Sequence, residues 1–265
     1  MNTQTKSGTL FLIPTNLGQP IQPEAILPAQ VIALTARLEY FVVENAKTAR
    51  QFLKSLNTVV PLQSLNLREL NEHTPASDLR SLLQPALEGK DVGLLSDAGA
   101  PAVADPGAQL VALAHASGVA VAPLVGPSSL LLALMASGLN GQTFAFHGYL
   151  PIERPERIAA LAALERESGK RNMTQIFIET PYRNNALLDD IVANTSAETK
   201  LCLATNLTAV DQFICTKRVA QWRTALPDLN RKPTVFLLLS EAAASDSGRN
   251  HFGFSKKSIL PQERQ

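Results

Sequence analysis

The sequence predicts an α/β protein in which short buried strands alternate with helices. Short β-rich apolar runs alternate with segments of helical periodicity along most of the chain. Alanine and leucine are frequent, and hydrophobic residues make up 45% of the 265 residues, which is enough for a substantial core. Several apolar runs end in turns of small residues, a pattern typical of open sheets that bind ligands. We expect mainly parallel pairing in the first half and a more mixed sheet in the second.

The first half predicts four strands and four helices. Short apolar runs predict strands at residues 9–13, 40–43, 92–95 and 119–124. Helical periodicity predicts helices at residues 23–38, 47–56, 77–88 and 107–117. Pro23 near the start of the first helix and Gly89 after the third are typical of helix boundaries. Residues 59–67 are ambiguous and could contain a short strand.

The second half begins at a turn, residues 125–129, that we interpret as a hinge. Helices are expected at residues 130–137, 155–167 and 185–194, with a polar turn at residues 170–172. Strands are expected at residues 144–150, 175–178, 200–204, 213–219 and 234–239. These elements predict an N-terminal α/β domain at residues 1–125 and a C-terminal α/β domain at 126–244. Residues 245–265 are polar without periodicity and predict a mobile tail.

Composition and charge exclude several classes of protein. The formal net charge is +1, so no global field draws the chain to nucleic acid, although Arg50, Lys54, Arg183, Lys217 and Arg218 could form a local basic face. The apolar run near the N-terminus is too short for a signal peptide or a membrane span. Cys202 and Cys215 lack metal-type spacing and are interpreted as free thiols of a reducing compartment. We therefore expect a cytoplasmic protein with no membrane association.

Most common catalytic signatures are missing from the sequence. We find no dinucleotide fingerprint, no P-loop and no nucleophile elbow. The four histidines are scattered without metal-ligand spacing, so we expect no metal. These absences disfavour nicotinamide chemistry, covalent catalysis and metal-dependent hydrolysis.

The most informative segment is residues 92–107, VGLLSDAGAPAVADPG. An apolar strand there leads through a turn of small residues into a helix, the arrangement in which open sheets bind ligands. Asp97 and Asp105 are the polar side chains of this loop. The alternative is an ordinary turn in which Asp105 caps the helix. Similar turns follow other strands at residues 14–18, 126–129 and 179–183, which suits an amphipathic cofactor bound largely by backbone groups.

Six further pieces join this loop in resembling a known family. They are LFLIPTNLG, PLVGPSS, HGYLP, IFIETPYRN, ATNLT and KPTVFLLL, in that order between about residues 8 and 240. Together they resemble the tetrapyrrole methylase superfamily of S-adenosylmethionine-dependent methyltransferases. The most similar branch is the ribose-2'-O-methyltransferase I of small-subunit ribosomal RNA.

The resemblance implies two α/β domains with S-adenosylmethionine in the cleft between them, a homodimer, and ribosomal RNA as the methyl acceptor. The implied cofactor-binding residues are Pro14, Asp97, Ala98, Gly99, Pro101, Val103, Ser128, Ser129, Thr180, Leu207, Thr208 and Thr234. If the acceptor is a hydroxyl, a base must take its proton. Glu44 and Glu179 are candidates because each follows a strand, although a cap or an ion pair is an alternative role for each.

Tyr182, Arg183 and Arg50 are the candidate contacts to the RNA substrate, by stacking and charge. The sequence also departs from the ribose-methylating branch. The branch's Glu-Asp-Thr-Arg-like motif reads Glu44-Asn45-Ala46-Lys47 here, and its Arg-Glu-Leu-Thr-Lys piece reads Thr205-Asn206-Leu207-Thr208-Ala209. Its first turn ends in Gly18-Gln19 instead of Gly-Asn, and its longer C-terminal region is a short tail here. Two alternatives stay open. The altered Glu44-Asn45 region leaves open a non-catalytic module that binds S-adenosylmethionine, and the weakly basic composition leaves open a methyltransferase of a small molecule such as a tetrapyrrole.

Overall fold

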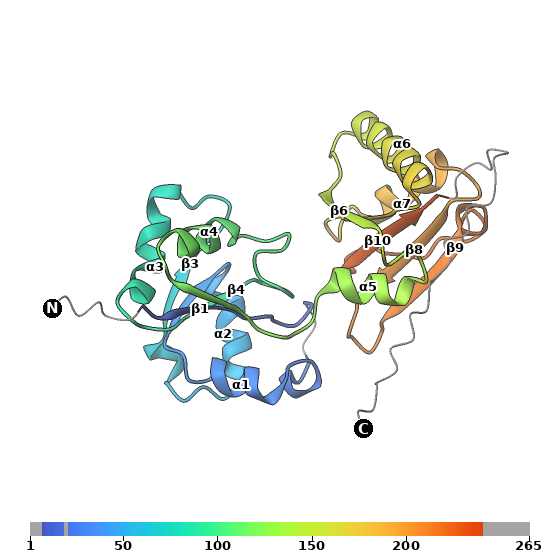
Figure 1. Cartoon of the computed structure of the whole chain (residues 1–265). Helices are drawn as coiled ribbons and strands as arrows, with labels where there is room; N and C mark the ends of the chain where they lie inside the picture. The colour runs from blue at the N-terminus through green and yellow to red at the C-terminus, as the bar shows by residue number, and fades with distance from the viewer. Residues whose placement is uncertain (1–6, 19–20, 241–265) are drawn as a thin grey trace, which may run out of the picture.

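The computed structural model describes residues 7–18 and 21–240, which form two five-stranded sheets joined through the segment between β5 and α5 (Figure 1). Sheet A has the strand order β3-β2-β4-β1-β5, and sheet B has the order β6-β7-β10-β8-β9. The strands are β1 (Thr9–Leu12), β2 (Tyr40–Val43), β3 (Asn66–Glu69), β4 (Val92–Leu95), β5 (Ala120–Pro123), β6 (Phe144–Tyr149), β7 (Thr174–Ile178), β8 (Lys200–Thr205), β9 (Phe213–Arg218) and β10 (Thr234–Leu239). The predicted α/β class is confirmed.

Sheet A is entirely parallel and is covered by helices on both faces. One core contains side chains of α3 (Leu79–Leu87) and α4 (Ala108–Ala116), and the other contains side chains of α1 (Ala29–Thr35) and α2 (Ala46–Ser55). The central strand β4 is therefore buried along its whole length. This explains why it is a continuous apolar run, because strands buried on both faces do not alternate.

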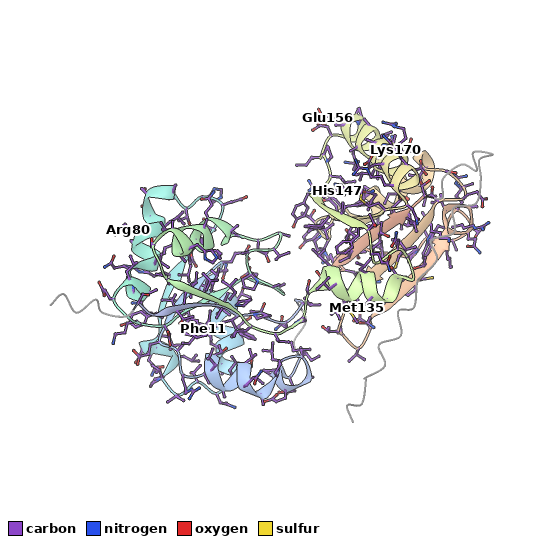
Figure 2. The ribbon with its side chains drawn as sticks, in the orientation of Figure 1. Phe11, Arg80, Met135, His147, Glu156 and Lys170 are labelled. Carbon is purple, nitrogen blue, oxygen red and sulfur yellow. The ribbon has the colours of Figure 1, made fainter. Side chains whose placement is uncertain are left out.

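Sheet B is mixed, as the sequence predicts for the second half. β6 and β7 are parallel, whereas β10 is antiparallel to both β7 and β8, and β8 is antiparallel to β9. One core packs the sheet against α6 (Arg154–Arg171), α7 (Asn184–Asn194) and α8 (Val219–Trp222), and contains the stacked rings of Phe177 and Phe236. The other core packs it against α5 (Ser129–Ser137). In Figure 2, Phe11 marks β1 of sheet A and His147 marks β6 of sheet B.

Several predicted boundaries are wrong for identifiable reasons. The helix predicted at residues 23–38 is split into a 3₁₀ turn, η1 (Pro23–Ala25), and α1, because Pro28 has no N–H to donate and stands in extended backbone before α1. The polar turn predicted at residues 170–172 is the end of α6, which closes at Asn172 in the left-handed region with φ 51°. Val219 does not extend β9 but begins α8.

The remaining differences are smaller. The ambiguous residues 59–67 contain a 3₁₀ turn, η2 (Leu62–Ser64), and the start of β3. The helix predicted at residues 77–88 is α3, preceded by η3 (Ala76–Asp78).

Contact between the two halves is made partly by the turn after β1. Leu17 belongs to this turn in the first half, yet it packs into the core between α5 and sheet B and is only 8% exposed. The division into domains at residue 125 stays a prediction. The predicted tail at residues 245–265 lies outside the described residues.

Candidate functional site

Two turns at the C-terminal edge of sheet A are tied together by backbone hydrogen bonds. The Thr15 amide donates to the Gly99 carbonyl at 2.9 Å, and the Gly99 amide donates to the Asn16 carbonyl at 2.9 Å. Gly99 has φ +74°, in the left-handed region that favours glycine, and a Cβ there would lie 3.1 Å from Leu17 Cδ2. The loop after β4 is thereby fixed against the turn after β1, at the position where parallel sheets bind ligands.

These turns form one wall of a cavity of about 230 Å³ that residues of both halves line. We call it the apolar cavity, because most of its lining side chains are aliphatic. Its lining residues are Leu17, Ala98, Gly99, Ala100, Val103, Ala104, Asp105, Ser128, Ser129, Leu130, Tyr149, Ile178, Glu179, Pro181, Ala204, Leu207, Pro233, Thr234 and Val235. Residues separated by more than 100 positions in the chain therefore meet at one site.

The structure brings most of the implied cofactor-binding residues to this cavity. Those that line it are Ala98, Gly99, Val103, Ser128, Ser129, Leu207 and Thr234. Four others, namely Pro14, Pro101, Thr180 and Thr208, are not among its lining residues. Asp97 lines two neighbouring hollows instead.

Within the described residues, the N-termini of α4 and α5 have no side-chain capping hydrogen bond. Ser128 is the N-cap of α5, and its hydroxyl makes no capping hydrogen bond within the described residues. The N-cap of α4 is Gly107, not Asp105. The interpretation of Asp105 as a helix cap is therefore wrong, and its carboxylate is available for another role.

Beside the apolar cavity lies a second cavity of about 790 Å³, which we call the acidic cavity. Its lining includes four carboxylates, Glu44, Glu72, Asp97 and Asp105. The other lining residues are Asn45, Leu70, Asn71, His73, Thr74, Ala104, Pro106, Gly107, Ala108, Gln109 and Tyr149. Ala104, Asp105 and Tyr149 line both cavities, so these three residues form a shared wall.

Two carboxyl groups of this cavity, Asp97 and Asp105, have raised pKa values. Burial, followed by the negative charge of Glu44, raises the pKa of Asp105 to about 6, against a smaller opposing effect of a hydrogen bond with Ser96. Burial and Glu44 likewise raise the pKa of Asp97, partly offset by a hydrogen bond with Thr48. Within residues 7–18 and 21–240, no cation is among the groups that shift either pKa, which is unusual for partly buried carboxylates and typical of functional sites.

The two candidate bases predicted from the sequence are held by hydrogen bonds. Glu44 Oε2 accepts from the Asp97 amide at 3.0 Å. Glu179, which is 5% exposed, lines the apolar cavity, and its Oε1 accepts from the Thr180 amide at 2.6 Å and from Arg183 Nη2 at 2.7 Å. The ion pair considered as an alternative role for Glu179 is thus present in the structure.

Tyr149 is a site residue that the sequence reasoning missed. Tyr149 is the last residue of β6 in sheet B, yet it lines both cavities beside the loop of sheet A. Burial, then the charges of Asp105 and Glu179, raise the pKa of its phenol. The segment HGYLP was recognised, but only the packing of the two halves places its tyrosine here.

The candidate RNA contacts differ in their surroundings. Tyr182 is 73% exposed, with the Arg231 guanidinium 5.6 Å from its ring centroid. Arg183 is committed to Glu179, and Arg50 is exposed on α2.

The predicted basic face is corrected by the sheet register. Lys217 and Arg218 are opposite Leu201 and Lys200, at the end of β8 remote from the cavity residue Ala204. Lys217 lies 4.7 Å from the Trp222 ring, and Arg218 pairs with Glu198 at 2.7 Å. These two residues do not surround the apolar cavity.

Metal-binding clusters and membrane-spanning helices are both absent from the described residues. Within residues 7–18 and 21–240, no group of three or more histidine, cysteine, aspartate or glutamate side chains is placed to hold a metal ion. Among the helices of the same residues, none has the length and apolarity needed to cross a membrane. Cys202 and Cys215 are free, as expected.

Known proteins show clear similarity to this chain, although no family model matches it. Ribosomal RNA small subunit methyltransferase I of Micromonospora olivasterospora is 36% identical over 206 residues, which is 78% of this chain and 61% of the relative. The chain therefore spans less than two thirds of that relative. The protein of the same name from Vibrio cholerae is 31% identical and aligns over 87% of this chain and 76% of its own length. The one from Xylella fastidiosa is 30% identical, with coverage of 96% and 91%.

Solved structures show the same fold. The methyltransferase CobJ superposes with a TM-score of 0.60 at 20% identity, over 91% of this chain and 98% of CobJ. Uroporphyrin-III-C-methyltransferase from Thermus thermophilus superposes with a TM-score of 0.52 at 18% identity, over 88% and 94% of the two chains. At these identities the similarity establishes the fold alone.

Proposed function

This chain belongs to the ribosomal RNA small subunit methyltransferase I family of the tetrapyrrole methylase superfamily, and we propose that it methylates a ribose 2'-hydroxyl of small-subunit ribosomal RNA. The methyl donor of this family is S-adenosylmethionine. The observation that carries the proposal is the apolar cavity, which the family's loop at residues 96–107 lines together with residues of sheet B.

The residues of the apolar cavity fit this cofactor. Aliphatic side chains such as Val103, Leu130 and Leu207 suit the flat adenine ring, and the hydroxyls of Ser128 and Ser129 can bind its polar groups. Asp105 adds negative charge to the cavity lining, which suits a sulfonium cation. We propose that the lining residues together with Pro14, Asp97, Pro101, Thr180 and Thr208 form the cofactor site, with the last five at its edge.

When bound, S-adenosylmethionine supplies an activated methyl group with its own leaving group. The protein then has to position the acceptor, exclude water and remove one proton. The tied turns at Thr15 and Gly99 fix one wall of the site before any ligand binds. A pre-formed wall lowers the entropy lost on binding and keeps the reacting atoms in line.

Acceptor contacts are proposed at the rim of the site. Tyr182 offers an exposed ring for stacking on a base, with Arg231 beside it. Arg50, exposed on α2, offers a guanidinium charge for a phosphate, whereas Arg183 acts mainly by holding Glu179.

The structure weakens the reasons for the two alternatives. In the departure from the Glu-Asp-Thr-Arg motif, Asn45 caps α2 by accepting from the Lys47 and Thr48 amides at 2.9 and 3.2 Å. Asparagine and aspartate are equally good caps, so this change preserves the local structure and does not favour a non-catalytic module. The carboxylates of the acidic cavity disfavour a tetrapyrrole that carries several carboxylates of its own.

We further propose a homodimer and a cytoplasmic location, the compartment of ribosomal RNA. Exposed apolar side chains on α5 support an interface: Leu131 is 55% exposed and Met135, labelled in Figure 2, is 79% exposed. Light scattering coupled to gel filtration measures the assembly directly. A monomer at micromolar concentration contradicts the homodimer without affecting the proposed chemistry.

The decisive experiment follows labelled methyl groups. The full chain is incubated with labelled S-adenosylmethionine and small ribosomal subunits from a strain that lacks this methyltransferase. We expect label in one ribose of the RNA, located by nuclease digestion and mass spectrometry. Cofactor binding without transfer to any RNA identifies a binding module, and transfer to a tetrapyrrole instead identifies a small-molecule enzyme.

A further inference from the structure

Asp105 occupies a position that no other carboxylate of the described residues shares, because it lines both cavities. Glu179 lines only the apolar cavity, and Glu44 and Asp97 line the acidic cavity but not the apolar one. The rest of the shared wall consists of Ala104 and Tyr149. A group on such a wall can contact two molecules that meet there.

Transfer of a methyl group to a hydroxyl needs such a group. The base has to reach the acceptor oxygen at the moment when that oxygen approaches the methyl carbon. We propose that Asp105 is the catalytic base of this reaction and that the acidic cavity receives the acceptor nucleoside. This inference rests on the proposed function and adds the base and the place of the acceptor.

The other candidate bases are less suited by their contacts. Oε1 of Glu179 takes three hydrogen bonds, from the Thr180 amide and from Nε and Nη2 of Arg183, so its charge is already compensated. Glu44 is anchored to the Asp97 amide and does not line the apolar cavity. Among the described residues, the groups that act on Asp105 are the carboxylates Glu44 and Asp97 and the Ser96 hydroxyl, and none of them is a cation that would lower its basicity.

The lining of the acidic cavity indicates which part of the RNA enters it. Four carboxylates repel phosphate, whereas the donors of a base and the hydroxyls of a ribose can bind to them. Asn71, His73 and Gln109 add amide and imidazole groups that can bind the edge of a base. We therefore expect one nucleoside inside the cavity and its two phosphates outside.

The proposed step combines methyl transfer to the ribose oxygen with removal of the hydroxyl proton. A bond forms between the methyl carbon and the ribose oxygen, and the C–S bond breaks with its electron pair left on sulfur. The hydroxyl proton passes to the Asp105 carboxylate and then to water. A base with a pKa of about 6 is ionised at neutral pH and still accepts a proton in the transition state. The ionisable groups that face it are Glu44, Asp97 and Tyr149, with Glu72 and His73 across the acidic cavity.

The first test measures protons and not activity. Titration calorimetry near pH 6, in two buffers of different ionisation enthalpy, gives the protons released when a ligand binds. S-adenosylmethionine carries a sulfonium charge that its product S-adenosylhomocysteine lacks, and this charge favours ionised Asp105. We expect wild-type protein to release up to about half a proton more with the cofactor than with the product.

Variants assign this difference to a residue. In Asp105→Asn the difference should disappear while the affinity for S-adenosylhomocysteine stays within threefold of wild type. Asp189→Asn, a matched change at an exposed position of α7, should behave as wild type. Single-turnover transfer to small ribosomal subunits at saturating cofactor should fall by about 100-fold or more in Asp105→Asn.

The outcomes separate the two levels of the proposal. If neither ligand binds to wild-type protein, the proposed function itself is wrong. If both bind but release equal numbers of protons, or if Asp105→Asn transfers methyl groups at the wild-type rate, then Asp105 is not the base. Equal proton release by wild-type protein rules Asp105 out even if the variant fails to fold.

Discussion

A buried carboxylate of the second half and two partly buried carboxylates of the first half have opposite surroundings. In the second half, Asp190 is 2% exposed and is bound by Arg157 Nη2 at 2.7 Å and Arg154 Nε at 2.8 Å. Burial alone would raise the pKa of Asp190, but the hydrogen bonds and charges of these arginines lower it. In the first half, Asp97 and Asp105 have no such partner in the part of the chain that the structure describes, and their pKa values are raised.

This difference separates structural charges from those of a site. A buried carboxylate with two arginines is satisfied within the fold and has nothing left for a ligand. Partly buried carboxylates that face one another destabilise the fold, so their presence indicates selection for binding or chemistry. Four predictions test this contrast, in order of decreasing expected effect.

Removal of a structural partner should have the largest effect on stability. Arg157→Leu leaves the buried Asp190 carboxylate with only Arg154, whose side chain is 68% exposed. We expect the free energy of unfolding to fall by about 3–5 kcal/mol, measured by urea denaturation. The matched control is Arg171→Leu, which removes an exposed pair with Glu167 and should cost under about 1 kcal/mol. Equal losses in both variants would show that the buried network is not structural.

Disruption of the loop in the first half should affect binding more than stability. Gly99→Val puts a branched side chain at φ +74° and against Leu17, which should distort the turn at the apolar cavity. A ligand at 100 times its Kd stabilises a protein by about 2.7 kcal/mol, and we expect S-adenosylhomocysteine to lose most of this in the variant. Thermal denaturation with and without ligand measures it. Gly141→Ala has open space around its Cβ and serves as the control. Full ligand stabilisation of Gly99→Val would remove this loop from the site.

An exposed aromatic at the rim should affect RNA alone. Tyr182→Ala removes a ring that is 73% exposed, so the fold should be unchanged. Loss of one stacked base costs about 1–3 kcal/mol of binding free energy, which fluorescence anisotropy with a fragment of small-subunit RNA can measure. Tyr182→Phe keeps the ring and should bind as wild type. If alanine and phenylalanine bind RNA equally well, Tyr182 does not contact the acceptor.

The smallest effect should be a gain of stability with a defined pH dependence. The pKa of Asp105 is raised from 3.8 to about 6 in the folded chain, so between these values the folded state binds more protons than the unfolded state. Stability therefore falls as pH rises through this window, and the penalty is complete above pH of about 6. Asp105→Asn removes the charge and should be more stable than wild type at neutral pH, with the advantage vanishing near pH 4.

Denaturation at several pH values measures this profile. Asp189→Asn is exposed and should show no such change with pH. A variant that is less stable than wild type at neutral pH would make Asp105 a structural charge like Asp190, and the contrast between the halves would fail.

The sequence by itself was sufficient for the fold class, the family and most of the loop that lines the apolar cavity. Apolar runs such as Val92–Leu95, bounded by turn residues, favour buried parallel strands, because a strand that is covered on both faces does not alternate. The turn of small residues that follows was recognised as a ligand loop, and Ala98, Gly99 and Val103 do line the apolar cavity. These are local properties, which neighbouring residues in the chain largely fix.

Tertiary structure alone decided which charges are compensated and which residues meet. The sequence identified Glu179 as a candidate base, but Arg183, in the turn before α7, holds it in an ion pair. The sequence left Asp105 as a possible helix cap. In the structure Gly107 is the N-cap of α4, and Asp105 lies between two cavities. The sequence did not indicate that Tyr149, at the end of β6 in the other sheet, would line both cavities beside this loop. The physical reason is that the charge state and role of a side chain depend on burial and on partners distant in the chain, and these exist only after the two halves have packed.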